Sequence, residues 1–151
     1  MVTTPDVEAT ILRLAAESEV AKVILRYADG VDRRNFDQVW ACFAPDANVK
    51  GSSFGGPLSE YLPRLLEGVR AFGATQHFMG NQLREVDGDR AHTETYCIAR
   101  HFRDTAGEEE VLTMGVRYQD DLVRTAEGHW VIAYREAVAM WRRYGRASSE
   151  A

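Results

Sequence analysis

The sequence has few cysteines, and Cys42 and Cys97 are the only two among 151 residues. Two cysteines are too few for a disulfide framework, and their separation does not match the short spacing of metal-binding pairs. His92 and His101 are nine residues apart and are expected on opposite faces of a strand, so no three-ligand metal set is evident. We therefore expect two reduced, half-buried thiols and no metal site.

Long apolar runs and clusters of basic residues are also missing. No apolar run approaches the roughly 18 residues that a membrane-spanning helix needs, and the start, MVTTPDVEAT, lacks the basic-then-apolar order of a signal peptide. The 18 Lys and Arg residues are scattered among 23 Asp and Glu residues, which leaves a formal net charge of −5. Nucleic acids and anionic membranes attract clustered positive charge. We therefore expect a cytoplasmic protein that binds neither nucleic acid nor a membrane.

Phosphate-cradling glycine loops and dinucleotide fingerprints are absent as well, so we expect chemistry without a cofactor. What the sequence does have is a 45% hydrophobic composition over 151 residues. A chain of this size forms one domain that buries about two thirds of its unfolded surface. We place this domain at residues 1–144 and a polar, frayed tail at residues 145–151.

The first half of the sequence predicts three helices. Apolar residues at helical spacing predict a long first helix that ends near Asp32; these residues are Ile11, Leu14, Val20, Ile24, Tyr27 and Val31. Asn35 is expected to cap a short second helix over residues 36–44, which Pro45 would stop. After a short strand candidate, ANVKG, a third helix is predicted over residues 60–72.

After Gly73 the apolar pattern changes from helical to alternating and predicts four strands. Their sequences are QHFMGNQLREV, RAHTETYCIARHFR, VLTMGVRYQDDLVR and HWVIAYREAVAMWR. Short turns join them, so the strands should form an antiparallel meander, and three helices should pack on one face and curve it. The predicted fold class is α+β, a cone-shaped roll with a strongly curved antiparallel sheet around an apolar pocket.

Two polar residues stand out against this framework. Asp32 lies at the C-terminus of a helix, where the macrodipole disfavours an anion, and a single Asp there is ordinarily a solvated turn residue. His77 begins a strand face that continues through Met79, Asn81 and Leu83, so its ring should point inward. A lone inward His is ordinarily a hydrogen-bonded core residue, but an Asp that orients a His makes the imidazole a better base.

Arg135 and His101 are the next candidates. Arg135 shares a small, apolar strand face, where a guanidinium needs an anion. That anion is either a structural carboxylate or a substrate group, and both readings stay open. His101 alternates with Cys97 and Ala99 and is expected to reach the cavity.

Three segments of the sequence are YADGVDRRNFDQVWACFAPDA, TQHFMGN and EGHWVIAYRE. They resemble the SnoaL-like branch of the nuclear-transport-factor-2-like (NTF2-like) superfamily, and especially scytalone dehydratase, hexachlorocyclohexane dehydrochlorinase and bile-acid 7α-dehydratase. The resemblance implies that Asp32 and His77 form the family's catalytic dyad. It also implies catalytic roles for Arg135, Tyr27 and His101, which match an active-site arginine, a tyrosine and a second histidine. His101 could donate a proton only if it is protonated near working pH.

Residues that differ from those of the family limit which substrates are expected. Val31 and Gly51 stand where scytalone dehydratase has tyrosines that polarise its substrate, so scytalone itself is not the expected substrate. We expect a small hydrophobic or polycyclic substrate instead. The residues predicted to bind it are Val31, Trp40, Phe54, Met79, Asn81, Tyr118 and Met140. The resemblance further implies a homo-oligomer. A trimer is the expected form, and a dimer is the alternative.

The favoured function is a cofactor-free lyase, a dehydratase or dehydrohalogenase that uses the Asp-His dyad as a general base. The first alternative is a polyketide cyclase or a ketosteroid-isomerase-like enzyme that uses the same base. The second alternative is a non-catalytic ligand-binding or assembly module, because one fold serves many functions.

Overall fold

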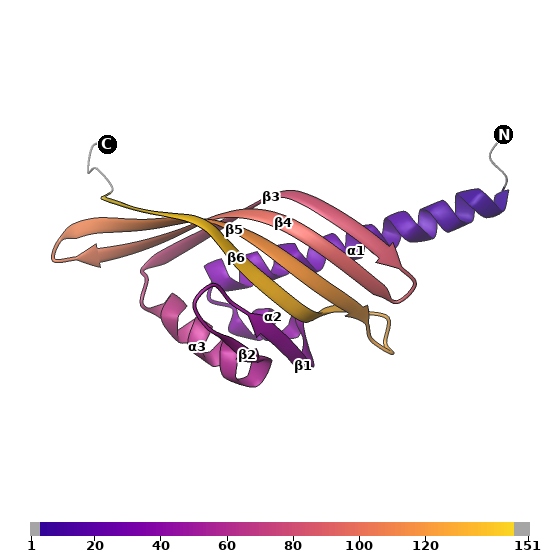
Figure 1. Ribbon diagram of the computed structural model, residues 1–151, viewed down its shortest axis with the longest axis horizontal. Helices are drawn as coiled ribbons and strands as arrows, with labels where there is room; N and C mark the ends of the chain where they lie inside the picture. The colour runs from indigo at the N-terminus through magenta and orange to yellow at the C-terminus, as the bar shows by residue number, and fades with distance from the viewer. Residues whose placement is uncertain (1–3, 147–151) are drawn as a thin grey trace.

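The computed structural model of the protein describes residues 4–146 (Figure 1). Its helices are α1 (Thr4–Asp32), α2 (Phe36–Ala41) and α3 (Leu58–Arg70). Its strands are β1 (Phe43–Lys50), β2 (Gly55–Pro57), β3 (Ala74–Asp87), β4 (Arg90–Thr105), β5 (Glu108–Arg124) and β6 (Trp130–Arg146). Within residues 4–146, no helix combines the length and the apolar composition that crossing a bilayer requires.

The six strands form one open, curved sheet in the order β2-β1-β6-β5-β4-β3. The predicted meander is confirmed, because β3, β4, β5 and β6 pair with their sequence neighbours in antiparallel register. The first predicted strand had no assigned neighbour, and it runs parallel to β6, so the sheet is antiparallel except for this one pair. A parallel pair needs a long crossover connection, and here the chain between β1 and β6 includes α3 and three strands of the meander.

The three helices lie on one face of the sheet, as predicted (Figure 1). Helix α1 passes beneath the meander next to β3, and α3 lies against β1. The core between the layers contains fully buried aliphatic side chains from each layer, among them Val20 and Ile24 of α1, Leu62 of α3 and Ile132 of β6. Burial of this apolar surface is the main force that holds the helices to the sheet.

The first turns of α1 differ from the expectation. Ile11 and Leu14 were expected on the buried stripe, but they are 60% and 53% exposed. Figure 1 shows the reason, because the N-terminal part of α1 extends beyond the edge of the sheet. Helical spacing identifies residues that share a face, but it does not show whether another element covers that face.

The second helix begins as predicted and ends earlier. The side chain of Asn35 accepts a hydrogen bond from the backbone N–H of Gln38 at 3.3 Å, which confirms the cap. The helix ends at Ala41, and Pro45 lies inside β1 instead of ending the helix. The register between β1 and β6 shifts between Phe43 and Asn48. The missing N–H of Pro45 is tolerated there because the ladder is interrupted.

Register shifts in β3 and β6 change which residues face the helices. The register of β3 with β4 shifts between Met79 and Gln82, so Leu83, which was expected to point inward, is 72% exposed. A second shift, near Ala133 in β6, places Ile132 in the core on the same side as Arg135. A single extra residue reverses an alternating pattern, which a period-two reading of the sequence cannot detect.

The predicted tail and thiols have separate outcomes. Strand β6 continues to Arg146, so residues 145 and 146 belong to the sheet, and the rest of the predicted tail, residues 147–151, lies outside the described residues. Cys42 and Cys97 are both free, as predicted, but they are fully buried. Burial raises the pKa of Cys42 to about 11 and that of Cys97 to about 12, so both thiols are protonated at neutral pH.

Candidate active site

The structure brings Asp32 and His77 together. Asp32 ends α1 and His77 lies near the start of β3, with 2.7 Å between the carboxylate Oδ1 and the ring Nδ1. The other carboxylate oxygen accepts the backbone N–H of His77, also at 2.7 Å, and the Thr75 hydroxyl donates to Oδ1 at 3.0 Å. These donors offset the unfavourable helix end.

The protonation state of this pair follows from the carboxylate. Burial alone would raise the pKa of Asp32, but the hydrogen bonds from the His77 ring, the His77 backbone and Thr75 outweigh it and lower the pKa below its ordinary value. Asp32 is therefore ionised at neutral pH, and an ionised carboxylate only accepts hydrogen bonds. The proton of a neutral His77 ring must then lie on Nδ1, which leaves the lone pair on Nε2 free to act as a base.

Arg34 and Thr75 support the pair, and the sequence reasoning missed both. Arg34 has a left-handed backbone, with φ of 61°. Its guanidinium donates to the Thr75 hydroxyl at 2.8 Å and to the Phe72 carbonyl at 3.1 Å. These hydrogen bonds connect the end of α1 to the segment that leads into β3. The only sequence signal was the arginine pair after Asp32, and the neighbouring Arg33 instead forms an exposed ion pair with Asp29.

His101 lies beside His77, as its alternation predicted. The two ring centroids are 5.6 Å apart and nearly perpendicular, and the Phe72 ring lies 4.9 Å from His101 on another side. Burial, followed by the proximity of His77, lowers the pKa of His101 to about 4. His101 is therefore neutral at pH 7, which argues against the expected role of a protonated acid.

This lowered pKa predicts a pH-dependent contribution to stability. The unfolded chain binds a proton at His101 near pH 6.5 and the folded protein only near pH 4, so the contribution is fully present above 6.5 and is lost as pH falls toward 4. We expect about 1 to 3 kcal/mol, allowing for the partial exposure of the ring. Urea unfolding between pH 4 and 7 should show a weaker pH dependence for His101→Gln than for wild type.

His129, which is exposed before β6, supplies the control for this measurement. His129→Gln should keep the pH dependence of wild type. Equal slopes for wild type and His101→Gln would show that His101 is not held neutral by its surroundings.

Arg135 is buried, and a structural carboxylate accompanies it. Its Nε and Nη2 donate to the two carboxylate oxygens of Asp120 at 2.6 and 2.9 Å, and both side chains are at most 1% exposed. The guanidinium carbon also lies 4.1 Å from the ring centroid of Tyr27 and 4.4 Å from that of Tyr118. Of the two anions considered for Arg135 from the sequence, the structure therefore shows the structural carboxylate. Within residues 4–146, the Nη1 of Arg135 has no hydrogen-bonding partner.

Asp120 was not among the predicted site residues. The inward alternation of β5 through Val116 and Tyr118 was the signal that could have found it. Tyr27 packs in the same buried cluster, where burial raises its pKa. Tyr27 and Arg135 lie together, but neither lines the cavities beside His101.

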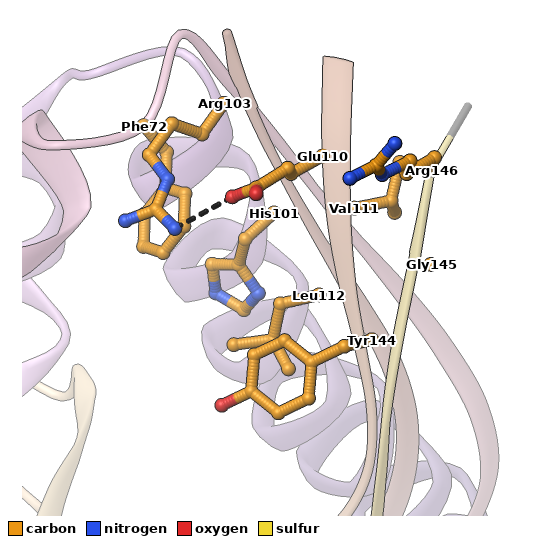
Figure 2. Close-up of a pocket in the computed structure, with 9 residues that line it drawn as sticks. All are labelled: Phe72, His101, Arg103, Glu110, Val111, Leu112, Tyr144, Gly145 and Arg146. Atoms are coloured by element: carbon orange, nitrogen blue, oxygen red, sulfur yellow. Dashed lines mark hydrogen bonds and ion pairs between the residues drawn. The ribbon is translucent and has the colours of Figure 1, made fainter. Parts of the chain in front are cut away.

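Two adjoining cavities open next to His101, with volumes of about 550 and 270 Å³. They share Phe72, His101, Leu112 and Tyr144 as lining residues. Figure 2 shows the larger one, where His101, Leu112 and Tyr144 come from register-matched positions on β4, β5 and β6. We call these two cavities together the His101 cleft.

Four predicted substrate-binding residues lie on the helix side of the sheet. Phe54 lines the smaller cavity of the His101 cleft. Met79 is half-buried against the core. Val31 and Tyr118 are fully packed core residues, and neither lines this cleft, which corrects their expected role as contacts in it.

The other three predicted substrate-binding residues lie away from the dyad. Trp40 is 38% exposed on α2. Asn81 and Met140 line a separate cavity of about 510 Å³ that also contains the outward-facing Phe78 and Trp141. The bulge in β3 turned Asn81 to this side, and a register shift in β6 accompanies Met140.

The expected homo-oligomer stays a prediction, which sedimentation velocity would check.

No metal-binding cluster is evident in the described part of the chain. Within residues 4–146, no group of three or more His, Cys, Asp or Glu side chains is arranged to hold an ion. The expectation of chemistry without a cofactor stays a prediction.

The curved sheet with three helices on one face defines an NTF2-like α+β protein. An NTF2-like protein with a cystatin-like fold from Novosphingobium aromaticivorans matches it with a TM-score of 0.73 at 21% identity, covering 93% of this chain and 92% of that one. The family model of the SnoaL-like domain matches residues 12–136. The chain therefore belongs to the SnoaL-like domain family, and the resemblance inferred from the sequence is confirmed.

One sequence relative and two further solved structures extend the comparison. The uncharacterized protein Rv2910c of Mycobacterium tuberculosis is 28% identical over 130 residues, 82% of this chain and 85% of the relative. A putative scytalone dehydratase from Novosphingobium aromaticivorans has a TM-score of 0.77 at 20% identity, covering 94% of this chain and 99% of that one. The hexachlorocyclohexane dehydrochlorinase LinA-type3 from Novosphingobium barchaimii has a TM-score of 0.73 at 17% identity, covering 91% and 94%.

Proposed function

We propose that the protein is a lyase that removes a β leaving group from a small cyclic substrate, with His77 as the general base and no cofactor. The observation that carries this proposal is the Asp32–His77 pair, in which an ionised carboxylate leaves Nε2 of the ring as a proton acceptor. The SnoaL-like fold and the names of two similar structures, a putative dehydratase and a dehydrochlorinase, support the same reaction class. At 20% and 17% identity these two structures are evidence for the fold, and the reaction class taken from their names is part of the proposal.

The proposed reaction starts with a carbon acid. Nε2 of His77 takes a proton from a carbon next to an electron-withdrawing group, and Asp32 stabilises the imidazolium that forms. The electron pair of the broken C–H bond forms the new double bond, and the leaving group departs with the electrons of its own bond. A departing halide needs no proton, whereas a departing hydroxide takes the proton that His77 had accepted.

A second candidate is an isomerase or cyclase, and His101 is the observation that favours it. Because the pKa of His101 is about 4, His101 supplies no proton to a leaving hydroxyl at pH 7, and a reaction in which no group leaves requires none. His77 would then return its proton to another carbon of the enolate, or the enolate would attack within the molecule. Deuterium uptake from solvent without loss of water or halide would identify this alternative.

Asp32→Asn tests the proposed base through the tautomer of His77. Only the oxygen of Asn can accept the backbone N–H of His77, so the amide nitrogen would face Nδ1. An amide nitrogen donates hydrogen bonds, and we therefore expect the ring proton to move from Nδ1 to Nε2. Long-range ¹H–¹⁵N NMR spectra of the histidine side chains would report this change as an exchange of the two nitrogen environments.

The pair formed by His92 and Asp121 supplies a matched control, because the same two atoms are also 2.7 Å apart but both side chains are exposed. Asp121→Asn should leave the His77 spectrum unchanged. If His77 shows the same tautomer in wild type and Asp32→Asn, Asp32 does not set the state of the ring and the proposed base is lost.

A further inference from the structure

Two arginines line the smaller cavity of the His101 cleft. Arg64 comes from α3 and Arg142 from β6. Arg142 Nη2 donates toward the hydroxyl oxygens of Ser52 and Ser53, at 3.3 Å each. The Arg64 guanidinium lies over the Phe54 ring, 4.3 Å from its centroid. Both cations are therefore positioned by neutral groups of this cavity wall.

The positive charge of this cavity is not balanced by protein carboxylates. No Asp or Glu lines it, and within residues 4–146 neither Arg64 nor Arg142 has an ion-pair partner. The larger cavity is different, because there Arg103 is paired with Glu110 at 2.7 Å (Figure 2). Both arginines are exposed residues, and their charges lie at one small cavity of a protein whose net charge is −5, so together they attract an anion there.

Asp32 and His77 line neither cavity of the His101 cleft, and His101 is the residue that links the smaller cavity to them. His101 lines the cavity, and its ring centroid is 5.6 Å from that of His77. Apolar side chains of Leu65, Val69 and Met114 cover other parts of the wall. A molecule in this cavity would have its apolar body against these side chains, its charged end near the arginines and another part against His101, whose ring adjoins His77.

We infer that the substrate of this site is an apolar cyclic compound with an anionic group, a carboxylate or a phosphate, which Arg64 and Arg142 bind. The hydroxyls of Ser52 and Ser53 would add neutral hydrogen bonds to the same group. The inference rests on the proposed function insofar as it treats the His101 cleft as the substrate site. It adds an anionic group to the small hydrophobic or polycyclic substrate that the sequence led us to expect.

Binding of matched naphthalene probes tests this inference. Isothermal titration calorimetry would compare 2-naphthoate with its neutral isostere 2-naphthamide at pH 7. Charge-assisted hydrogen bonds are about twice as strong as neutral ones, and we expect wild type to bind the acid about tenfold more tightly. Arg64→Gln and Arg142→Gln should each reduce this preference, and the double variant should remove it, whereas the affinity for the amide should stay unchanged.

Arg143→Gln is the matched control, because it removes the same charge from the next residue of β6, whose side chain points to the opposite face. It should keep the tenfold preference. A third probe, 2-naphthyl phosphate, identifies the anion: tighter binding than 2-naphthoate indicates a phosphate ester, and weaker binding indicates a carboxylic acid.

The inference is overturned if wild type binds acid and amide equally, if it does not bind the acid at millimolar concentration, or if Arg143→Gln acts as strongly as Arg142→Gln. These outcomes are independent of catalysis, because binding is measured without turnover. A preserved acid preference together with an unchanged His77 tautomer in Asp32→Asn would support the anion site and reject the proposed base.

Discussion

Asp120→Asn is expected to lower the free energy of unfolding by about 3 to 5 kcal/mol. The substitution removes the charge that faces Arg135, while the guanidinium stays in a position that is 1% exposed. Tyr27 and Tyr118 stack on its faces but cannot replace a carboxylate. Urea unfolding followed by circular dichroism would measure the loss.

The neighbouring Asp121 provides the control for Asp120. Its side chain is 60% exposed, and its ion-pair partner within residues 4–146 is His92, so Asp121→Asn should change stability by no more than about 1 kcal/mol. A double variant that replaces both buried charges, Asp120→Leu with Arg135→Met, should be more stable than Asp120→Asn, because no buried charge remains unpaired. Equal losses for Asp120→Asn and Asp121→Asn would show that the buried pair does not stabilise the fold.

His77→Gln is expected to reduce the elimination rate by about 10² to 10⁴-fold, the usual contribution of a general base. Glutamine keeps a polar side chain near Asp32 but has no group that can take a proton from carbon. Asp32→Asn should cause a loss of similar size, because a ring protonated on Nε2 cannot accept a proton there. The measurement is kcat/KM for the best substrate from a screen of cyclic β-hydroxy and β-halo carbonyl compounds.

A double variant tests whether Asp32 and His77 act together. His77→Gln with Asp32→Asn should be about as slow as His77→Gln alone, because residues that act as a unit are not additive. His92→Gln should retain the wild-type rate, since that exposed ring is paired with Asp121 and lines a different cavity. Retention of the wild-type rate by His77→Gln would exclude His77 as the base.

Much of the fold was predictable because it follows from local patterns. The helix that ends at Asp32 and the meander after Gly73 follow from the change of apolar period, and the Asn35 cap follows from side-chain chemistry. The meeting of Asp32 and His77 was predicted from two polar residues in unlikely places together with a family resemblance.

The misplaced strand residues have one cause in common. A bulge after Met79 turned Asn81 and Leu83 outward, and a bulge near Ala133 changed the neighbours of Arg135. Bulges depend on pairing with another strand, and a single strand's sequence contains no clear sign of them. The parallel pairing of β1 with β6 is likewise a contact between distant segments.

By itself, the sequence determined the helix-on-sheet class and most of the elements, because period, capping and turn chemistry act between near neighbours in the chain. The two residues of the dyad were named only together with the family resemblance. The tertiary structure alone decided that Asp120 neutralises Arg135, that Arg34 and Thr75 support Asp32, that burial beside His77 keeps His101 neutral, and that Arg64 and Arg142 share a cavity. Electrostatic energies depend on distance and burial in space, and neither quantity is defined until distant segments of the chain have packed together.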